Sequence, residues 1–178
     1  MLVIGAVLAG LCCVGGLVAA AVKGAGDARL TSAVADTDPP PTRAQAHARL
    51  GQPARDGQFE FTVRSMACDR PTVGDQLFHK AAQGRFCLVT VDVRNVGTRP
   101  RSLSGGNQIA TGPGRVAYRN DVLAELYANR NTKTFYENIS PGNSVTGTLV
   151  FDIPTGARIT ALELHDSRFS RGVTVDVG

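Results

Sequence analysis

The sequence predicts an all-β protein, a β-sandwich that follows an apolar N-terminal segment and a Pro-rich linker. Between residues 57 and 178, apolar and polar residues alternate with a period of two in several segments, as in half-buried strands. Turn-forming residues are frequent, with 20 Gly and 9 Pro in 178 residues. The composition, 43% hydrophobic and 19% charged, excludes collagen, a coiled coil and a wholly disordered chain.

Residues 1–22 are predicted to form a transmembrane anchor or a signal segment. The run from Leu2 to Val22 holds no charged residue. As a helix it would measure about 31 Å, close to the roughly 30 Å thickness of the hydrocarbon core. A cleaved signal is the alternative, although the segment has no basic start and its apolar core is long for a signal. A lipidated cysteine is not expected, because Leu11 rather than a small residue precedes Cys12.

The charges that flank this run and the cysteines of the C-terminal domain, Cys68 and Cys87, indicate opposite orientations in the membrane. Lys23 and Arg29 follow the run and no Lys or Arg precedes it, which by the positive-inside rule places the C-terminal domain in the cytoplasm. A disulfide in that domain favours the opposite side. We therefore expect the true start codon to lie upstream and to supply a basic segment, and mass spectrometry of the native N-terminus tests this.

Residues 23–56 are predicted to form a flexible linker rich in Ala and Pro. Three consecutive prolines, Pro39 to Pro41, disrupt both helix and sheet hydrogen bonding. The composition is typical of a semi-rigid spacer. The alternative is a binding segment that orders on contact with its partner.

Residues 57–178 are predicted to form about seven to nine short strands, and their unequal lengths favour a sandwich over a closed barrel. The expected strands are 59–63, 87–94, 109–111, 116–118, 145–153, 159–164 and 173–177. The expected inward rows of the two strongest strands are Cys87, Val89, Val91 and Val93, and Val145, Gly147, Leu149, Phe151 and Ile153. One helix is expected at residues 121–128, where Val122, Leu123 and Leu126 follow Asp121 as an N-cap.

Cys68 and Cys87 are the two cysteines of this domain, and we predict that they form a disulfide. The bond would close a loop of about 20 residues and contribute roughly 3 kcal/mol in the chain-entropy model. Stable disulfides form in oxidising compartments, so the pair favours an extracytoplasmic location. Two buried thiols are the alternative. A metal site is not predicted, because the spacing is not that of paired zinc ligands.

No pattern in the sequence predicts catalysis or a cofactor. The stretch Gly142 to Gly147 lacks the spacing of a nucleophile elbow, and a strand rather than a helix is expected after it. The three histidines lie far apart in the sequence. The net charge of +4 is spread along the chain, so no nucleic-acid partner is predicted. We expect a protein that is not an enzyme.

The segment from Arg115 to Tyr136 is the candidate partner-binding surface, because it combines all three tyrosines of the chain with several cations. Tyr and Arg are the residues most enriched at binding hot spots. The alternative is a loop whose aromatic side chains form local core. The candidate residues are Tyr118, Arg119, Tyr127, Arg130 and Tyr136.

Four stretches carry a resemblance to a known family: Phe59 to Val63, Gly84 to Gly97, Ile139 to Gly142, and Gly147 to Pro154. Together with Cys68 they resemble the DUF4352, or telokin-like, family of actinobacterial and firmicute envelope proteins, the MPT63-like proteins. The likeness covers about residues 51–178. It implies an immunoglobulin-like sandwich that is secreted or anchored by one N-terminal helix, with no established enzymatic activity. Its motifs specify the fold and hardly any chemistry.

The sequence therefore predicts a non-enzymatic binding or interaction domain of the bacterial cell envelope. We expect a single-pass membrane location with the C-terminal domain extracytoplasmic, or secretion if the N-terminal segment is cleaved. The expected partners are the membrane, through the N-terminal helix, and a protein or cell-wall component. An accessory or sensor subunit of a membrane complex is the alternative, and a hydrolase is the weakest hypothesis.

Overall fold

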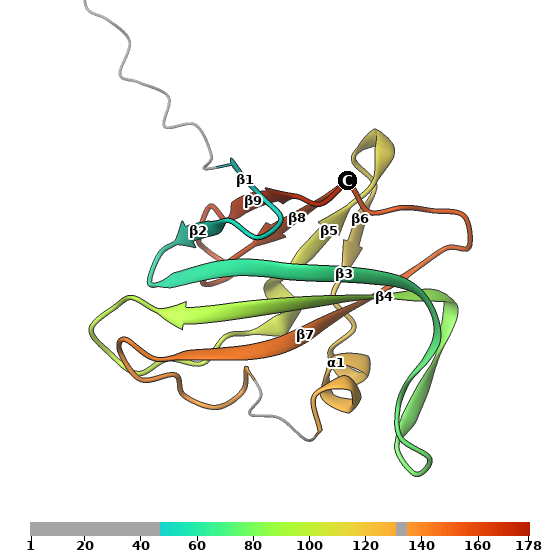
Figure 1. The fold of residues 1–178 in the computed structure, drawn as a ribbon, viewed down its shortest axis with the longest axis horizontal. Helices are drawn as coiled ribbons and strands as arrows, with labels where there is room; N and C mark the ends of the chain where they lie inside the picture. Colours follow the sequence, from blue (N-terminus) through green and yellow to red (C-terminus); the bar gives the residue numbers. More distant parts are fainter. Residues whose placement is uncertain (1–46, 131–134) are drawn as a thin grey trace, which may run out of the picture. The chain divides into compact units, whose positions relative to one another are not determined.

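The computed structural model describes residues 47–130 and 135–178, which form two β-sheets packed face to face (Figure 1). One sheet has the strand order β1-β9-β8-β5-β6 and the other has the order β2-β3-β4-β7. The strands are β1 (His47–Arg49), β2 (Pro53–Asp56), β3 (Phe59–Gly74), β4 (His79–Asn95), β5 (Ile109–Thr111), β6 (Ala117–Arg119), β7 (Ser144–Ile153), β8 (Ala161–Leu164) and β9 (Val173–Asp176). The expected β-sandwich is confirmed.

The predicted anchor or signal segment, residues 1–22, and the linker as far as residue 46 lie outside the described residues. Within residues 47–130 and 135–178, no helix has the length and hydropathy that a membrane crossing requires.

Strands β1 and β2 lie within the predicted linker, which therefore extends too far toward the C-terminus. β1 pairs in parallel with β9, with His47 opposite Thr174, and β2 pairs antiparallel with β3, with Ala54 opposite Phe61. The buried apolar side chains of these two strands are small, Ala48 and Ala54, each 7% exposed. The alternation of large apolar residues that marks the other strands is therefore missing. β1 is defined by its pairing with β9 at the far end of the chain, and β2 by a tight hairpin with β3.

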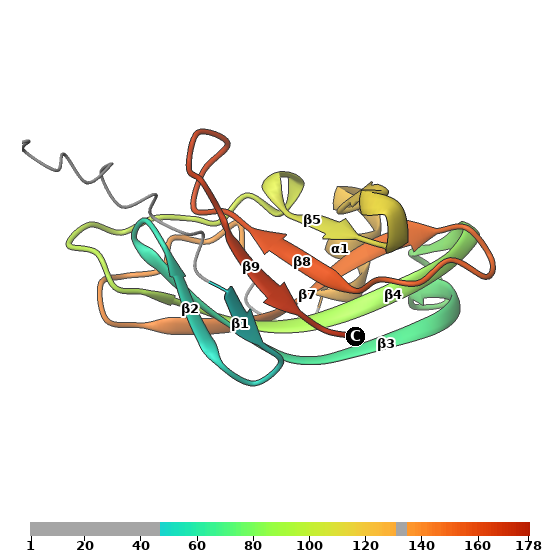
Figure 2. The same cartoon turned by 90° about the horizontal axis from the view of Figure 1, so that it is seen from above.

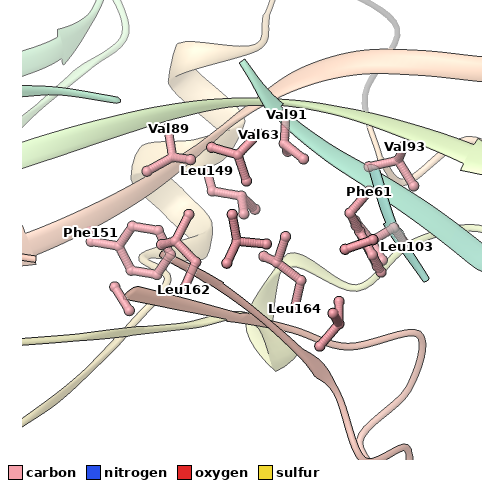
Figure 3. Packing of buried hydrophobic residues seen from close by; sticks show 14 of the residues in the cluster. Phe61, Val63, Val89, Val91, Val93, Leu103, Leu149, Phe151, Leu162 and Leu164 are labelled. Atoms are coloured by element: carbon pink, nitrogen blue, oxygen red, sulfur yellow. The ribbon is translucent and has the colours of Figure 1, made fainter. Parts of the chain in front are cut away.

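The core lies between the two sheets, and Figure 3 shows side chains of β3, β4 and β7 meeting those of β8. The expected inward row of β4, which includes Val89 and Val91, is fully buried. Leu149 and Phe151 of β7 are buried as predicted. Gly147 belongs to the same row because the ring of Phe135 fills the space that a Cβ atom would take.

The helix α1 (Val122–Ala128) begins as predicted, with the Asp121 side chain accepting a hydrogen bond of 3.0 Å from the backbone N–H of Ala124. The helical spacing of its large apolar residues does not correspond to a buried side. Ala124 is buried, whereas Leu123 and Leu126 are exposed. Small side chains face the sheet because they let the helix lie close against it, and the large ones are left in solvent.

The buried side of α1 covers a second apolar cluster on the outer face of the four-stranded sheet. This cluster consists of Val73, Phe86, Ala124 and Val150, with Leu88 packed against it. The helix therefore joins the β3–β4 hairpin to β7 on the side of the sheet that faces away from the main core.

Two asparagines that flank α1 cover the edge of the sheet formed by β7. The Asn120 side chain accepts a hydrogen bond from the Val150 N–H (2.7 Å). The Asn129 side chain accepts from the Thr148 N–H and donates to the Thr148 carbonyl, both at 2.8 Å. Asp121 donates its backbone N–H to the Val150 carbonyl at 2.7 Å. These bonds replace the missing neighbouring strand at an edge that would otherwise attract another chain.

Candidate binding surface

The disulfide between Cys68 of β3 and Cys87 of β4 is present, which confirms the prediction. It joins neighbouring strands of one sheet, whereas the disulfide of antibody domains joins the two sheets. Next to it, Asp69 has a φ of 71°, and the β3–β4 register shifts between Ala67 and Arg70. The bond lies at this β-bulge and ties the two strands together where a long hairpin extension begins. We call this extension, residues 70–82, the arm.

The turn of the arm is held by its own backbone and by one carboxylate. Asp75 accepts hydrogen bonds from the N–H groups of Leu77 (2.9 Å) and Phe78 (2.8 Å), and its own N–H donates to the Phe78 carbonyl at 3.0 Å. These backbone donors are the main reason that the pKa of Asp75 lies below its usual value. Gly74 precedes the turn with a φ of 103°, and a Cβ atom there would collide with the Phe78 carbonyl.

The arm is fastened to α1 at both ends of the helix. Beyond the C-terminal end, the Arg130 guanidinium pairs with Asp75 at 2.7 Å and stacks over the Phe78 ring, 4.0 Å from its centroid. The Phe78 ring also packs against Tyr127, with 6.5 Å between centroids. At the N-terminal end, Lys80 forms an ion pair with Asp121. The arm and α1 therefore form one unit (Figure 1).

Several large apolar side chains of this unit lie in solvent. Leu77 is 85% exposed and Phe78 is 47% exposed, although both sit on an ordered turn. On α1, Leu123 lies one turn before Tyr127 and three residues before Leu126, so these side chains continue the apolar surface from Phe78 around the helix. Arg130 belongs to the same surface because its guanidinium stacks over Phe78. We call these residues together the arm–helix surface: Leu77, Phe78, Leu123, Leu126, Tyr127 and Arg130.

A cleft of about 330 Å³ opens beside the arm–helix surface, between the arm and the C-terminal end of α1. Its lining combines residues that carry hydroxyl groups, the two cations Arg70 and Arg130, and apolar residues that include Leu88 and Ala128. Among the described residues, Arg70 has no ion-pair partner, whereas Arg130 is paired with Asp75.

The structure brings together two of the five predicted surface residues, Tyr127 and Arg130, at the cleft. Tyr118 lies on β6, partly buried against the main core, and lines a different hollow. Arg119 lies on the same strand and is exposed. Tyr136 is 45% exposed and interacts with Glu125. The predicted segment is therefore split over separate places, and its binding role stays a prediction.

Behind α1 lies a buried carboxyl group that sequence reasoning did not single out. Glu125 is fully buried, and a Cβ atom at Gly105 would occupy the position of its carboxyl group. Burial raises the pKa of Glu125 to about 7, and hydrogen bonds from Asn120 and Tyr136 oppose that increase only in part. One oxygen, Oε1, has no hydrogen-bond partner within the described part of the chain. Burial, followed by the Glu125 charge, raises the pKa of Tyr136 to about 12.

Sequence reasoning also missed Arg70, Leu77 and Phe78. The apolar pair Leu77–Phe78 directly after Asp75 and Gln76 was the available signal, because two large apolar residues in a turn are seldom placed there by core packing. Over residues 47–130 and 135–178, no group of three or more His, Cys, Asp or Glu side chains is arranged to hold a metal ion.

The fold and this surface define a disulfide-bonded β-sandwich domain with an ordered arm. The chain belongs to the DUF4352 family, described as a domain of unknown function, whose model matches residues 48–174. The match starts within β1, in agreement with the structural start of the domain. A comparison with curated proteins gives no match.

Solved structures share the fold at low sequence identity. A secreted protein from Mycobacterium tuberculosis, MPT63, is 13% identical with a TM-score of 0.58, over 76% of this chain and 99% of that chain. The yjhA protein from Bacillus subtilis is 14% identical with a TM-score of 0.54, over 74% and 99%. A conserved hypothetical protein from Bacillus anthracis is 16% identical with a TM-score of 0.51, over 71% and 94%.

Proposed function

We propose that this protein is a non-enzymatic, extracytoplasmic binding module of the bacterial envelope, anchored by its N-terminal segment or secreted. The Cys68–Cys87 disulfide supports the location, because such bonds persist in oxidising compartments. The fold similarity to MPT63, which is named a secreted protein, points the same way. The immunoglobulin-like topology and the single-pass anchor expected from the sequence remain parts of this proposal.

The arm–helix surface is the observation that carries the binding role. A soluble domain gains nothing in its own stability from an 85%-exposed Leu77, yet the turn that bears it is fixed by hydrogen bonds to Asp75 and by Arg130. Exposed apolar groups gathered on an ordered element are typical of interaction sites. Because the surface is held in place before binding, a partner would lose little conformational freedom in ordering it.

A protein is the partner that this surface fits best. This surface combines Phe78, Tyr127 and Arg130 in mutual contact. Tyr and Arg are enriched at the hot spots of protein interfaces, and Phe is enriched in their buried centres. The surface also lies at the end of the domain away from β1, where the described chain begins (Figures 1 and 2). Strands β1 and β2 therefore do not cover this surface.

Site-specific photo-crosslinking of the full chain in the native host tests this proposal. One variant carries a photoreactive phenylalanine at Leu77, and the matched control carries it at Phe169, which is 82% exposed in the loop between β8 and β9. We expect one discrete protein adduct from position 77 that is lost when Leu126→Asp is added. The same adducts from both positions, or an adduct from position 77 that survives Leu126→Asp, would overturn the proposal.

A further inference from the structure

We propose that the cleft between the arm and α1 binds a carboxylate of the partner protein, an Asp or Glu side chain, with the Arg70 guanidinium as its counterion. This inference rests on the protein-binding role proposed above. It names the chemical group that the cleft recognises, and it places that group beside the arm–helix surface.

The charge balance of the cleft is the first argument. Its carboxylate neighbours are already engaged, because Asp69 pairs with Arg85 and Asp75 pairs with Arg130. In the part of the chain that the structure describes, no carboxylate lies within 4.0 Å of the Arg70 guanidinium. The cleft therefore presents one positive charge that the domain itself does not neutralise.

The side chains around Arg70 are suited to an anion. Thr72, Tyr127 and Thr148 line the cleft, and each carries a hydroxyl group that can donate a hydrogen bond. The guanidinium supplies a planar fork of N–H donors that matches a carboxylate in two parallel bonds. A carboxylate that accepts from Arg70 would thus find further donors from β3, β7 and α1 within the same cleft.

The size of the charge favours a carboxylate over a phosphate. Arg70, which has no carboxylate partner among the described residues, balances a single negative charge, whereas a phosphate group carries about −1.5 to −2 at pH 7. Leu88 and Ala128 give the cleft an apolar portion against which the methylene groups of an acidic side chain can pack. The cleft volume of about 330 Å³ accommodates such a side chain.

The position of the cleft favours a protein as the source of that carboxylate. Tyr127 and Arg130 belong both to the cleft lining and to the arm–helix surface. A partner that covers Leu77 and Phe78 would therefore bring its neighbouring side chains to the mouth of the cleft. Apolar contact and one buried ion pair would then act together, the ion pair setting the orientation of the partner.

An NMR titration of the isotope-labelled full chain in detergent micelles tests the inference with small probes. The probes are the capped amino acid N-acetylglutamic acid α-amide, its uncharged glutamine counterpart, and inorganic phosphate. We expect the backbone amide signals of Thr72 and Thr148 to shift along one saturating curve with the acid, with a dissociation constant on the order of 1–10 mM. The glutamine counterpart should leave these signals unchanged.

Two variants control the titration. Arg70→Gln should abolish the saturable shift, while Arg94→Gln, an exposed arginine near the other end of β4, should retain it. Equal responses to the acid and its glutamine counterpart, or a saturable shift that survives Arg70→Gln, would overturn the inference. A larger and tighter response to phosphate would overturn the choice of a carboxylate.

The two proposals fail in different ways. If the titration is negative while the adduct from position 77 forms, the carboxylate site is wrong and the protein-binding role stands. If the titration is positive while positions 77 and 169 give the same adducts, the cleft binds acids but the arm–helix surface is not a protein interface, so the protein source of the carboxylate is refuted.

Discussion

Replacing Glu125 by Gln should change how the stability of the domain depends on pH. The Glu125 carboxyl is fully buried, and its pKa rises from 4.5 to about 7. Between these two values the folded chain binds more protons than the unfolded chain, so the free energy of unfolding falls as the pH rises. At 1.36 kcal/mol for each pH unit, the ionised carboxyl costs the folded state roughly 3 kcal/mol above pH 7.

The glutamine variant does not titrate and keeps an acceptor for Asn120, whose side chain donates to the Glu125 carboxyl group. At pH 4.5 we expect the variant and the wild type to be equally stable within about 1 kcal/mol. At pH 8 the variant should be more stable, by up to about 3 kcal/mol. Asp75, Asp92 and Asp121 have lowered pKa values in both proteins, and their contributions cancel when the two are compared.

Urea unfolding at pH 4.5, 6 and 8, followed by circular dichroism, measures this difference. Glu137→Gln is the matched control, because Glu137 is exposed in the segment that also carries Tyr136. The control should follow the wild type at every pH. Parallel pH profiles for wild type and Glu125→Gln would refute the reasoning, since they would mean that the buried carboxyl does not change its protonation between pH 4.5 and 8.

Three other perturbations test the parts of the fold that support the surface. Replacing Cys68 and Cys87 by Ala should lower the free energy of unfolding by about 3 kcal/mol; an unchanged urea midpoint under oxidising conditions would contradict this. Asn129→Ala leaves the Thr148 N–H and carbonyl unpaired at the β7 edge and should cost roughly 2–4 kcal/mol. Faster hydrogen exchange at Thr148 and dimers in size-exclusion chromatography are the expected signs, and their joint absence would count against the capping role. Gly147→Ala places a methyl group against an aromatic ring of the core and should cost roughly 1–3 kcal/mol in urea unfolding; wild-type stability would show that the ring moves aside.

The parts of the fold that the sequence reveals are those in which side-chain pattern and burial agree. The inward rows of β4 and β7 follow strict alternation because each strand has one face on the core, so period two marks them. Asp121 marks the start of α1 because capping is a local interaction.

The remaining parts have no such pattern of side chains. β1 and β2 carry Ala48 and Ala54 as their only buried apolar side chains, so hydrophobic alternation gives no signal for either strand. The partner of β1 is also remote, since it lies in β9, whereas β2 pairs with β3 in a local hairpin. The buried side of α1 cannot be read from the sequence, because the distance to the sheet, and not hydrophobicity, selects Ala124 for the inside.

Local sequence patterns also fail to predict the candidate site, since its residues come from two separate segments. Tyr127 and Arg130 could be selected by residue type, but Arg70 and Phe78 become relevant only when the arm folds back onto α1. No local property distinguishes Arg70 from the other arginines of the chain. Its unpaired charge depends on which carboxylates the neighbouring arginines use.

The parallel pairing of β1 with β9 has a consequence for the order in which the domain can assemble. The first strand of the domain can complete its sheet only after residues 173–176, the last strand, have been synthesised. Until then the five-stranded layer lacks β9, which joins β1 to β8. If the chain crosses the membrane N-terminus first, as the proposed location requires, the five-stranded sheet cannot be completed until nearly the whole chain has passed. The domain would close on the far side of the membrane, where Cys68 and Cys87 can be oxidised.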